Sequence, residues 1–359
     1  MIAFAMILSF SACGGGGESA PAEPAEETAE TAAEPNAGVT GIVVTLPEGW
    51  ELSSFSENSS SVYTKAGSPL QFGISAFTQA DVDSMKDSSF KTVQDFYDKY
   101  YKITEENLKK HNIQLENIKV CDCDAEYIKR PHDKDDFSVL STSFICDDAI
   151  YEIYLTSPNA IEWNSGGKIS DSAPVLSDEE IAMYEAVLAS AQKGDGNAIQ
   201  KEQLASFTVD SIGSVSFEAP AGFYPKSVSD NYITFGKDGS DAEFYFNVTH
   251  PEDLQNITLE DGSHPSSIKD YYNSNYFFEG MEKEEIAGFD GFVNKYPDED
   301  GSYYNVGGGF LADDGIYDFT LDANAYDWEN DGALKEGAQP LTEDDIAAFD
   351  AFVASIKKK

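Results

Sequence analysis

The chain has 359 residues, and its 65 acidic against 23 basic side chains give a formal net charge of −42 at pH 7. A field of this sign repels phosphate backbones and anionic headgroups, which excludes nucleic acid as a partner. About 320 residues follow the first forty, and a length of this order is typical of two domains.

An apolar run from Ile2 to Phe10 is followed by two small residues, Ser11 and Ala12, and then by Cys13. The run is far shorter than the ~20 residues that span a bilayer. Residues 1–13 resemble a bacterial lipoprotein signal peptide, although no Lys or Arg precedes the apolar run. The resemblance implies a lipid on Cys13, a membrane as partner, and a location at the outer face of the bacterial cell membrane.

Residues 14–40 contain six glutamates, three prolines, no aromatic residue and no cation. Such a segment cannot bury enough apolar surface to offset its ordering entropy, so we expect a disordered acidic linker. Its repelling charges favour an extended spacer between the membrane and the folded part.

The rest of the chain repeats itself. Three pairs of segments correspond in order: 46–50 with 219–223, 145–155 with 311–321, and 176–181 with 341–346. This pattern predicts a tandem duplication, with one domain over 41–193, a flexible linker over 194–203 and a second domain over 204–359.

Each predicted copy consists of alternating strands, a helix with tyrosines at helical spacing, further strands and a closing helix. Ser177 with Glu180 forms a capping box for the first closing helix, and Thr342 with Asp345 forms a weaker one for the second. The apolar stripe behind each cap should pack on a sheet. We therefore expect an α+β fold, a mostly antiparallel sheet packed against helices.

This order of elements is similar to the PsbP-like α/β/α sandwich. The resemblance rests on Pro47-Glu48-Gly49-Trp50, on the tyrosine helix and on the closing stretch from Phe349 to Lys357. It implies a fold and a binding or scaffolding role, with no reaction attached.

Catalytic and metal motifs are absent from the sequence. None of the four histidines stands in H-E-x-x-H or another paired spacing, and there is no nucleophile elbow or P-loop. The segment from Asp327 to Gly332 partly imitates a calcium loop, but Ala338 stands where the bidentate carboxylate belongs. We expect no enzyme, no cofactor and no metal site.

Three further cysteines follow the signal peptide. Cys121 and Cys123 alternate on a predicted strand and lie too far apart to bridge each other comfortably. Either could pair with Cys146 if the strands are neighbours, and buried thiols are the other interpretation.

Trp163 and Trp328 occupy matching loop positions beside Asn159 and Asn324. These side chains could bind a sugar or peptide, while tryptophans that only cover the sheet edge are the simpler interpretation.

The leading hypothesis is a non-enzymatic lipoprotein that binds or scaffolds an unknown envelope protein. The alternative is capture of a small ligand (a sugar, peptide or cation) by the loops or the interdomain cleft, and a hydrolase with paired carboxylates comes last.

Overall fold

The computed structural model describes residues 34–85, 89–133, 136–162, 168–259, 264–275, 284–298, 301–327 and 333–359. Cys13 and residues 14–33 of the predicted acidic linker lie outside this part of the chain. The last residues of that linker are ordered, because β1 (Ala37–Val39) already pairs with β2 (Ile42–Val44). Contacts divide the chain into an N-terminal unit, residues 1–205, and a C-terminal unit, residues 206–359.

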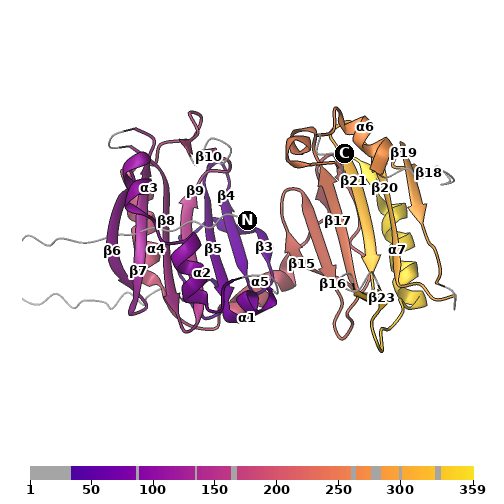
Figure 1. Cartoon of the computed structure of the whole chain (residues 1–359), viewed down its shortest axis with the longest axis horizontal. Coiled ribbons are helices and arrows are strands. Elements are labelled where there is room, and N and C mark those ends of the chain that lie inside the picture. The colour runs from indigo at the N-terminus through magenta and orange to yellow at the C-terminus, as the bar shows by residue number, and fades with distance from the viewer. Residues whose placement is uncertain are drawn as a thin grey trace, which may run out of the picture. The chain divides into compact units, whose positions relative to one another are not determined.

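The N-terminal unit is built on an antiparallel sheet of seven described strands (Figure 1). Their order across the sheet is β3 (Trp50–Ser56), β4 (Ser60–Lys65), β5 (Gln71–Thr78), β9 (Ala149–Thr156), β8 (Phe137–Cys146), β7 (Cys123–Pro131) and β6 (Gln114–Val120). A small sheet joins β1 and β2 to β12 (Gln192–Lys193), and β10 (Ile161–Glu162) pairs with β11 (Lys168–Ile169).

The helices of this unit are mostly short: α1 (Gln79–Ser84), α2 (Val93–Tyr100), α3 (Glu105–Lys110), α4 (Asp178–Ser190) and α5 (Gly196–Ser206). Helices α2 and α4 contact opposite faces of the sheet. The Tyr97 hydroxyl lies 3.2 Å from the Ser143 hydroxyl, and the Tyr184 hydroxyl lies 2.9 Å from that of Thr142. Because neighbouring residues of a strand point to opposite faces, β8 presents an α2 face and an α4 face.

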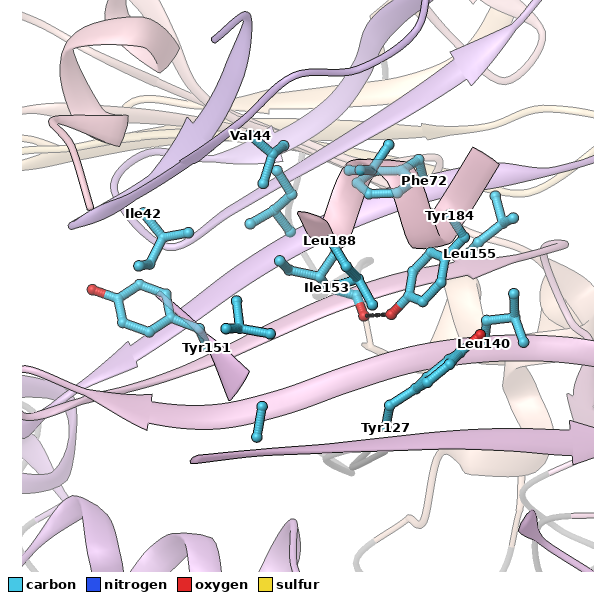
Figure 2. Close-up of a cluster of buried hydrophobic side chains, with 14 of the residues drawn as sticks. Ile42, Val44, Phe72, Tyr127, Leu140, Tyr151, Ile153, Leu155, Tyr184 and Leu188 are labelled. Atoms are coloured by element: carbon cyan, nitrogen blue, oxygen red, sulfur yellow. Dashed lines mark hydrogen bonds between the residues drawn. The ribbon is translucent and has the colours of Figure 1, made fainter. Parts of the chain in front are cut away.

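The larger apolar core of the N-terminal unit lies on the α4 face (Figure 2), and a smaller cluster lies between the sheet and helices α1 and α2. Tyr184 is fully buried there, with its ring 5.3 Å from that of Tyr127 and 6.1 Å from that of Phe72. Its hydroxyl donates a hydrogen bond of 2.7 Å to the carbonyl of Ile153. The period-2 pattern of the strands supplies the apolar side chains that α4 covers.

The C-terminal unit contains the same order of strands. Its sheet runs β15 (Tyr224–Val228), β16 (Tyr232–Gly236), β17 (Glu243–Thr249), β21 (Ile316–Asp322), β20 (Asn305–Leu311), β19 (Phe289–Asn294) and β18 (Glu284–Ile286). Shorter elements are β13 (Ser211–Ile212), β14 (Val215–Ser216), β22 (Tyr326–Asp327), β23 (Ala333–Leu334), β24 (Lys357–Lys358), the 3₁₀ helix η2 (Pro251–Asn256) and α6 (Ile268–Asn275). Helix α7 (Glu343–Ser355) lies along one face of the sheet (Figure 1).

Aromatic side chains fill the core between α7 and its sheet. The ring of Phe352 lies 4.5 Å from that of Phe244, 5.2 Å from Phe246 and 5.3 Å from Phe217. Both predicted capping boxes are confirmed: Ser177 caps α4 and Thr342 caps α7, each with its side chain accepting from the backbone N–H three residues later. These caps satisfy N–H groups that a helix start otherwise leaves unpaired.

The predicted fold class is wrong. Strands make up 40% of the structure and helices 23%, so the molecule is a mostly antiparallel β protein rather than an α+β, PsbP-like α/β/α sandwich. The apolar stripes of α4 and α7 correctly indicate helices that cover one face of a sheet. In the described part of the chain, the opposite face of each sheet carries only helices of eight residues or fewer. A sandwich needs a helical layer there, and such short helices do not form one.

The segment 194–203, predicted as a flexible linker, is mostly helical in the structure. Most of it belongs to α5, which packs on the N-terminal unit through the side chains of Asn197, Gln200 and Gln203. Gln200 is only 1% exposed, which is unusual for an amide side chain. The sequence of this segment is polar and contains glycine, so it does not predict a helix. The helix forms hydrogen bonds with residues that are distant in the sequence.

Candidate functional site

The α2 face of the N-terminal sheet is polar at its centre. On β9, Tyr151, Ile153 and Leu155 belong to the apolar core, so the alternate residues Glu152 and Tyr154 point to the α2 face. Neighbouring strands place serines beside them, because Ser75 pairs with Glu152 and Ser141 pairs with Tyr154 in the sheet register. The short helices leave part of this polar surface open.

Glu152 is the central charged group of this face. It lies on a strand bounded on both sides by other strands, and its residue is only 6% exposed. The hydroxyl of Ser141, itself 1% exposed, donates a hydrogen bond of 3.2 Å to Glu152 Oε1. Acidic residues are almost never buried in this way unless they are paired or bound. Ser141 supplies one such partner, and the charge of Arg130 supplies another.

A pocket of about 390 Å³ opens over Glu152. We call it the polar pocket; its lining includes Gln71, Ser75, Ser141, Glu152, Tyr154 and Asn159. Its volume falls within the range of about 300–1,000 Å³ that is typical of small-molecule sites. Val139, Ala160 and Ile161 also line the pocket, so its carboxylate, hydroxyl and amide groups offer hydrogen bonds beside apolar surface.

Tyr154 forms one wall of the polar pocket because its cross-strand partner is a glycine. Gly73 pairs with Tyr154, and a Cβ on Gly73 would lie 2.0 Å from Tyr154 Cζ. The aromatic ring thus occupies the space above the glycine. Burial, and secondly the charge of Glu152, raise the pKa of the Tyr154 hydroxyl well above its usual value. Tyr154 therefore stays a neutral donor and acceptor at physiological pH.

Replacing Gly73 by alanine should push the Tyr154 ring into the polar pocket. We expect the free energy of unfolding to fall by about 1–3 kcal/mol, the usual cost of an overpacked core site. Urea unfolding should show a much smaller cost for the same change in a Tyr154→Ala background, where the ring is gone. Equal costs in both backgrounds would contradict this account.

Arg130 adds a positive charge to the α2 face. It is the only arginine in the sequence and lies half-buried on β7. Burial lowers the pKa of its guanidinium to about 10, and the charge of Glu152 opposes that shift. The two charges therefore interact across the face, although 22 residues separate them in the sequence. Neither residue was singled out from the sequence.

The predicted ligand-binding residues have different outcomes. Asn159 lines the polar pocket, and its φ of 59° places it in a left-handed turn. Asn324, in the C-terminal unit, also has a left-handed φ of 52° and donates a hydrogen bond of 2.7 Å to the carbonyl of Asp241. Trp163 and Trp328 lie outside the described residues.

The cysteines are arranged differently from the expected alternating pair. Cys121 stands with Asp122 in the two-residue turn between β6 and β7, and both residues have positive φ angles of 50° and 65°. Cys123 begins β7 and forms a disulfide with Cys146 at the end of β8, with a Cα–Cα distance of 5.9 Å. Cys121 is a free cysteine, and burial raises the pKa of its thiol.

The C-terminal unit has a related carboxylate at the same place in its sheet. Asp318 follows Tyr317 on β21 as Glu152 follows Tyr151 on β9. The side-chain amide of Asn247 donates a hydrogen bond of 3.0 Å to Asp318 Oδ1. The described residues contain no cluster of three His, Cys, Asp or Glu that could hold a metal ion.

Sequence signals for Glu152 and Arg130 exist but are weak. Glu152 interrupts an otherwise apolar and aromatic strand, and a single arginine in an acidic chain is unusual. On an alternating strand, however, a polar residue normally indicates a solvent-facing position. Only the three-dimensional arrangement reveals that this position is buried.

Comparison with known proteins identifies no family. No family model and no curated protein matches the chain. A crystal structure from Bacteroides thetaiotaomicron is 10% identical, with a TM-score of 0.24, and the match covers 42% of this chain and 47% of that one. The structure of a Tle4–Tli4 complex is 9% identical, with a TM-score of 0.23 and coverage of 86% and 97%. Within the described residues, no helix has the length and apolarity needed to cross a membrane.

Proposed function

We propose that this chain is a non-enzymatic, extracytoplasmic binding protein whose N-terminal unit captures a small hydrophilic solute in the polar pocket. The observation that carries the proposal is the buried carboxylate of Glu152 in a pocket of about 390 Å³. A carboxylate in that place disfavours an apolar ligand and favours one with hydroxyl or ammonium groups.

Solute capture is favoured over scaffolding by the exposed surface as well as by the pocket. A scaffolding surface should expose a contiguous apolar patch. The large exposed apolar side chains among the described residues come from separate elements instead: Tyr100, Leu115, Val175, Tyr232, Tyr296 and Leu334. Isolated exposed apolar residues are normal on a protein surface and need no partner to explain them.

We also propose that Cys13 carries a lipid that holds the chain at the outer face of a bacterial membrane. The support is the sequence of residues 1–13 together with the acidic, proline-containing tract that follows. Mass spectrometry of the membrane-fractionated protein should find Cys13 diacylglycerylated. An unmodified Cys13 in that fraction would refute the anchor.

A duplication of one ancestral domain is the third part of this proposal. Its support is the shared strand order of the two units and the equivalent capping boxes of α4 and α7. All residues that line the polar pocket belong to the N-terminal unit. Ligand capture is then assigned to one unit.

The test is a thermal-shift screen of the full chain with glucose, N-acetylglucosamine, lysine, putrescine and dialanine. A ligand at one hundred times its Kd should stabilise the protein by about 2.7 kcal/mol. At about 2–4 °C per kcal/mol, that corresponds to a Tm increase of at least about 5 °C.

The variant Glu152→Gln keeps the shape of the side chain and removes its charge. It should weaken binding of the ligand about tenfold or more, because a charged hydrogen bond contributes about 1.5–3 kcal/mol. The matched control is Glu202→Gln, the same change at an exposed position of α5. A screen without any Tm increase, or equal affinities for both variants, would refute solute capture in this pocket.

A further inference from the structure

We propose that a second pocket of the N-terminal unit binds a small oxyanion, a phosphate or carboxylate group, through the guanidinium of Arg130. This pocket has a volume of about 330 Å³ and lies beside the end of α3, the end of β7 and the start of β11. Its lining contains five basic side chains, which together define the basic pocket: Lys110, His111, Arg130, His132 and Lys168.

The basic pocket contains residue types that are rare in this chain, arginine and histidine. The whole sequence contains one arginine and four histidines, and the arginine and two of the histidines line this pocket. Such a concentration contrasts with a chain whose net charge is −42. A local positive potential in a strongly negative molecule attracts anions selectively to that place.

Two carboxylates, Asp133 and Asp171, share the lining. Lys168 Nζ lies 2.7 Å from Asp171 Oδ1, so these two charges largely neutralise each other. Three permanent cations therefore face the two carboxylates of the lining, and Arg130 also interacts with the charge of Glu152. This balance suits a small anion of low charge.

His111 lies near two of the cations that line the basic pocket. Its pKa is lowered by burial first, and then by the charges of Lys110 and Arg130. The second imidazole of the lining belongs to His132, whose Nδ1 lies 3.4 Å from the hydroxyl of the fully buried Ser138. Both imidazoles thus share the lining with Lys110, Arg130 and Lys168.

Arg130 suits an oxyanion better than a lysine would. Its planar guanidinium presents a rigid fork of N–H donors that matches carboxylate and phosphate geometry. The residue lies half-buried on a sheet strand, so its side chain is more constrained than the exposed Lys110 and Lys168. A compact anion is indicated because the rest of the molecule repels a polyanion.

This inference does not rest on the proposed solute capture. The hairpin of β10 and β11 contributes to both pockets, with Ile161 in the lining of the polar pocket and Lys168 in that of the basic pocket. Glu152 lines only the polar pocket. The variant Glu152→Gln should therefore weaken solute capture about tenfold or more, while it leaves anion binding intact or strengthens it.

Isothermal titration of the full chain with sodium phosphate and with sodium succinate, at pH 7.5 and low ionic strength, tests the proposal. We expect saturable binding that weakens as salt is added. Phosphate alone would indicate a tetrahedral ligand, succinate alone a carboxylate, and both a general oxyanion site. All three results support the inference, and saturable binding of neither anion overturns it.

Variants locate the binding. Arg130→Gln should weaken it at least about tenfold, because charge-assisted hydrogen bonds are lost. Lys110→Gln, at an exposed position, should weaken it less and is not expected to disturb folding. Lys201→Gln on α5 removes the same charge away from the pocket and should bind like the unaltered chain. If Arg130→Gln and Lys110→Gln both bind like Lys201→Gln, the basic pocket is not the site.

Discussion

Replacing Tyr184 by alanine is expected to lower the free energy of unfolding of the N-terminal unit by about 3–5 kcal/mol, the usual cost of truncating a buried aromatic residue. The side chain is fully buried, and its ring packs against those of Phe72 and Tyr127. It also supplies the hydrogen bond to the Ile153 carbonyl that joins α4 to the central strand β9 (Figure 2). Its loss leaves a cavity and removes that link.

Tyr184→Phe separates the two contributions. It keeps the ring and should cost only about 1–2 kcal/mol, since it removes the hydrogen bonds to Ile153 and Thr142. Glu179→Ala, at an exposed position in the first turn of α4, is the control and should change stability little. Hydrogen exchange of β8 and β9 peptides in increasing urea measures the effect within this unit. An alanine variant as stable as the phenylalanine variant would contradict the assigned role of the ring.

Features that depend on neighbours in sequence were predictable. The capping boxes at Ser177 and Thr342 need only four consecutive residues each, and both exist. The apolar stripe behind the Ser177 cap contains Tyr184, Val187 and Leu188, and all three are buried in the core. Such signals are readable because their physical cause, a helix start or a helix face, is contained in the segment itself.

The fold class failed for a different reason. An amphipathic helix shows that a sheet face is covered, but it does not show whether the other face is covered as well. The rule that each β layer packs against further layers led to the prediction of a sandwich. In the structure the α2 face is partly open, and its polar residues, such as Glu152 and Ser141, explain why a full helical layer was not needed there.

The candidate site depends on tertiary contacts, which sequence patterns predict least well. Asn159 was found because it stands in a loop, where binding residues are common. Glu152 was missed because period-2 alternation assigns it to solvent, and the pocket that encloses it is formed by residues from 71 to 161. Burial of a polar strand position is a property of the tertiary fold, and no local pattern encodes it.

Helix α5 gives the second large expected effect. Gln200→Leu should destabilise the attachment of α5 by about 3 kcal/mol, because each buried polar group left unpaired costs about 1–3 kcal/mol. The Gln200 amide oxygen accepts a 2.7 Å hydrogen bond from the Asn58 N–H, and the amide nitrogen donates to the Ser60 carbonyl at 2.8 Å and to the Ser61 hydroxyl at 2.9 Å. Leucine fits the space but satisfies none of these groups.

The expected result of Gln200→Leu is faster hydrogen exchange in peptides from α5 and from the turn between β3 and β4, with β8 and β9 still protected. Lys201→Ala, the exposed neighbour on the same helix, should leave exchange of both regions unchanged. Unchanged exchange in Gln200→Leu would show that other contacts hold α5, such as the 2.7 Å hydrogen bond from the Thr40 N–H to Asn197. With the helix detached, residues 194–203 would behave as the flexible linker that their composition predicts. One buried amide would then account for the difference between the sequence-based expectation and the structure.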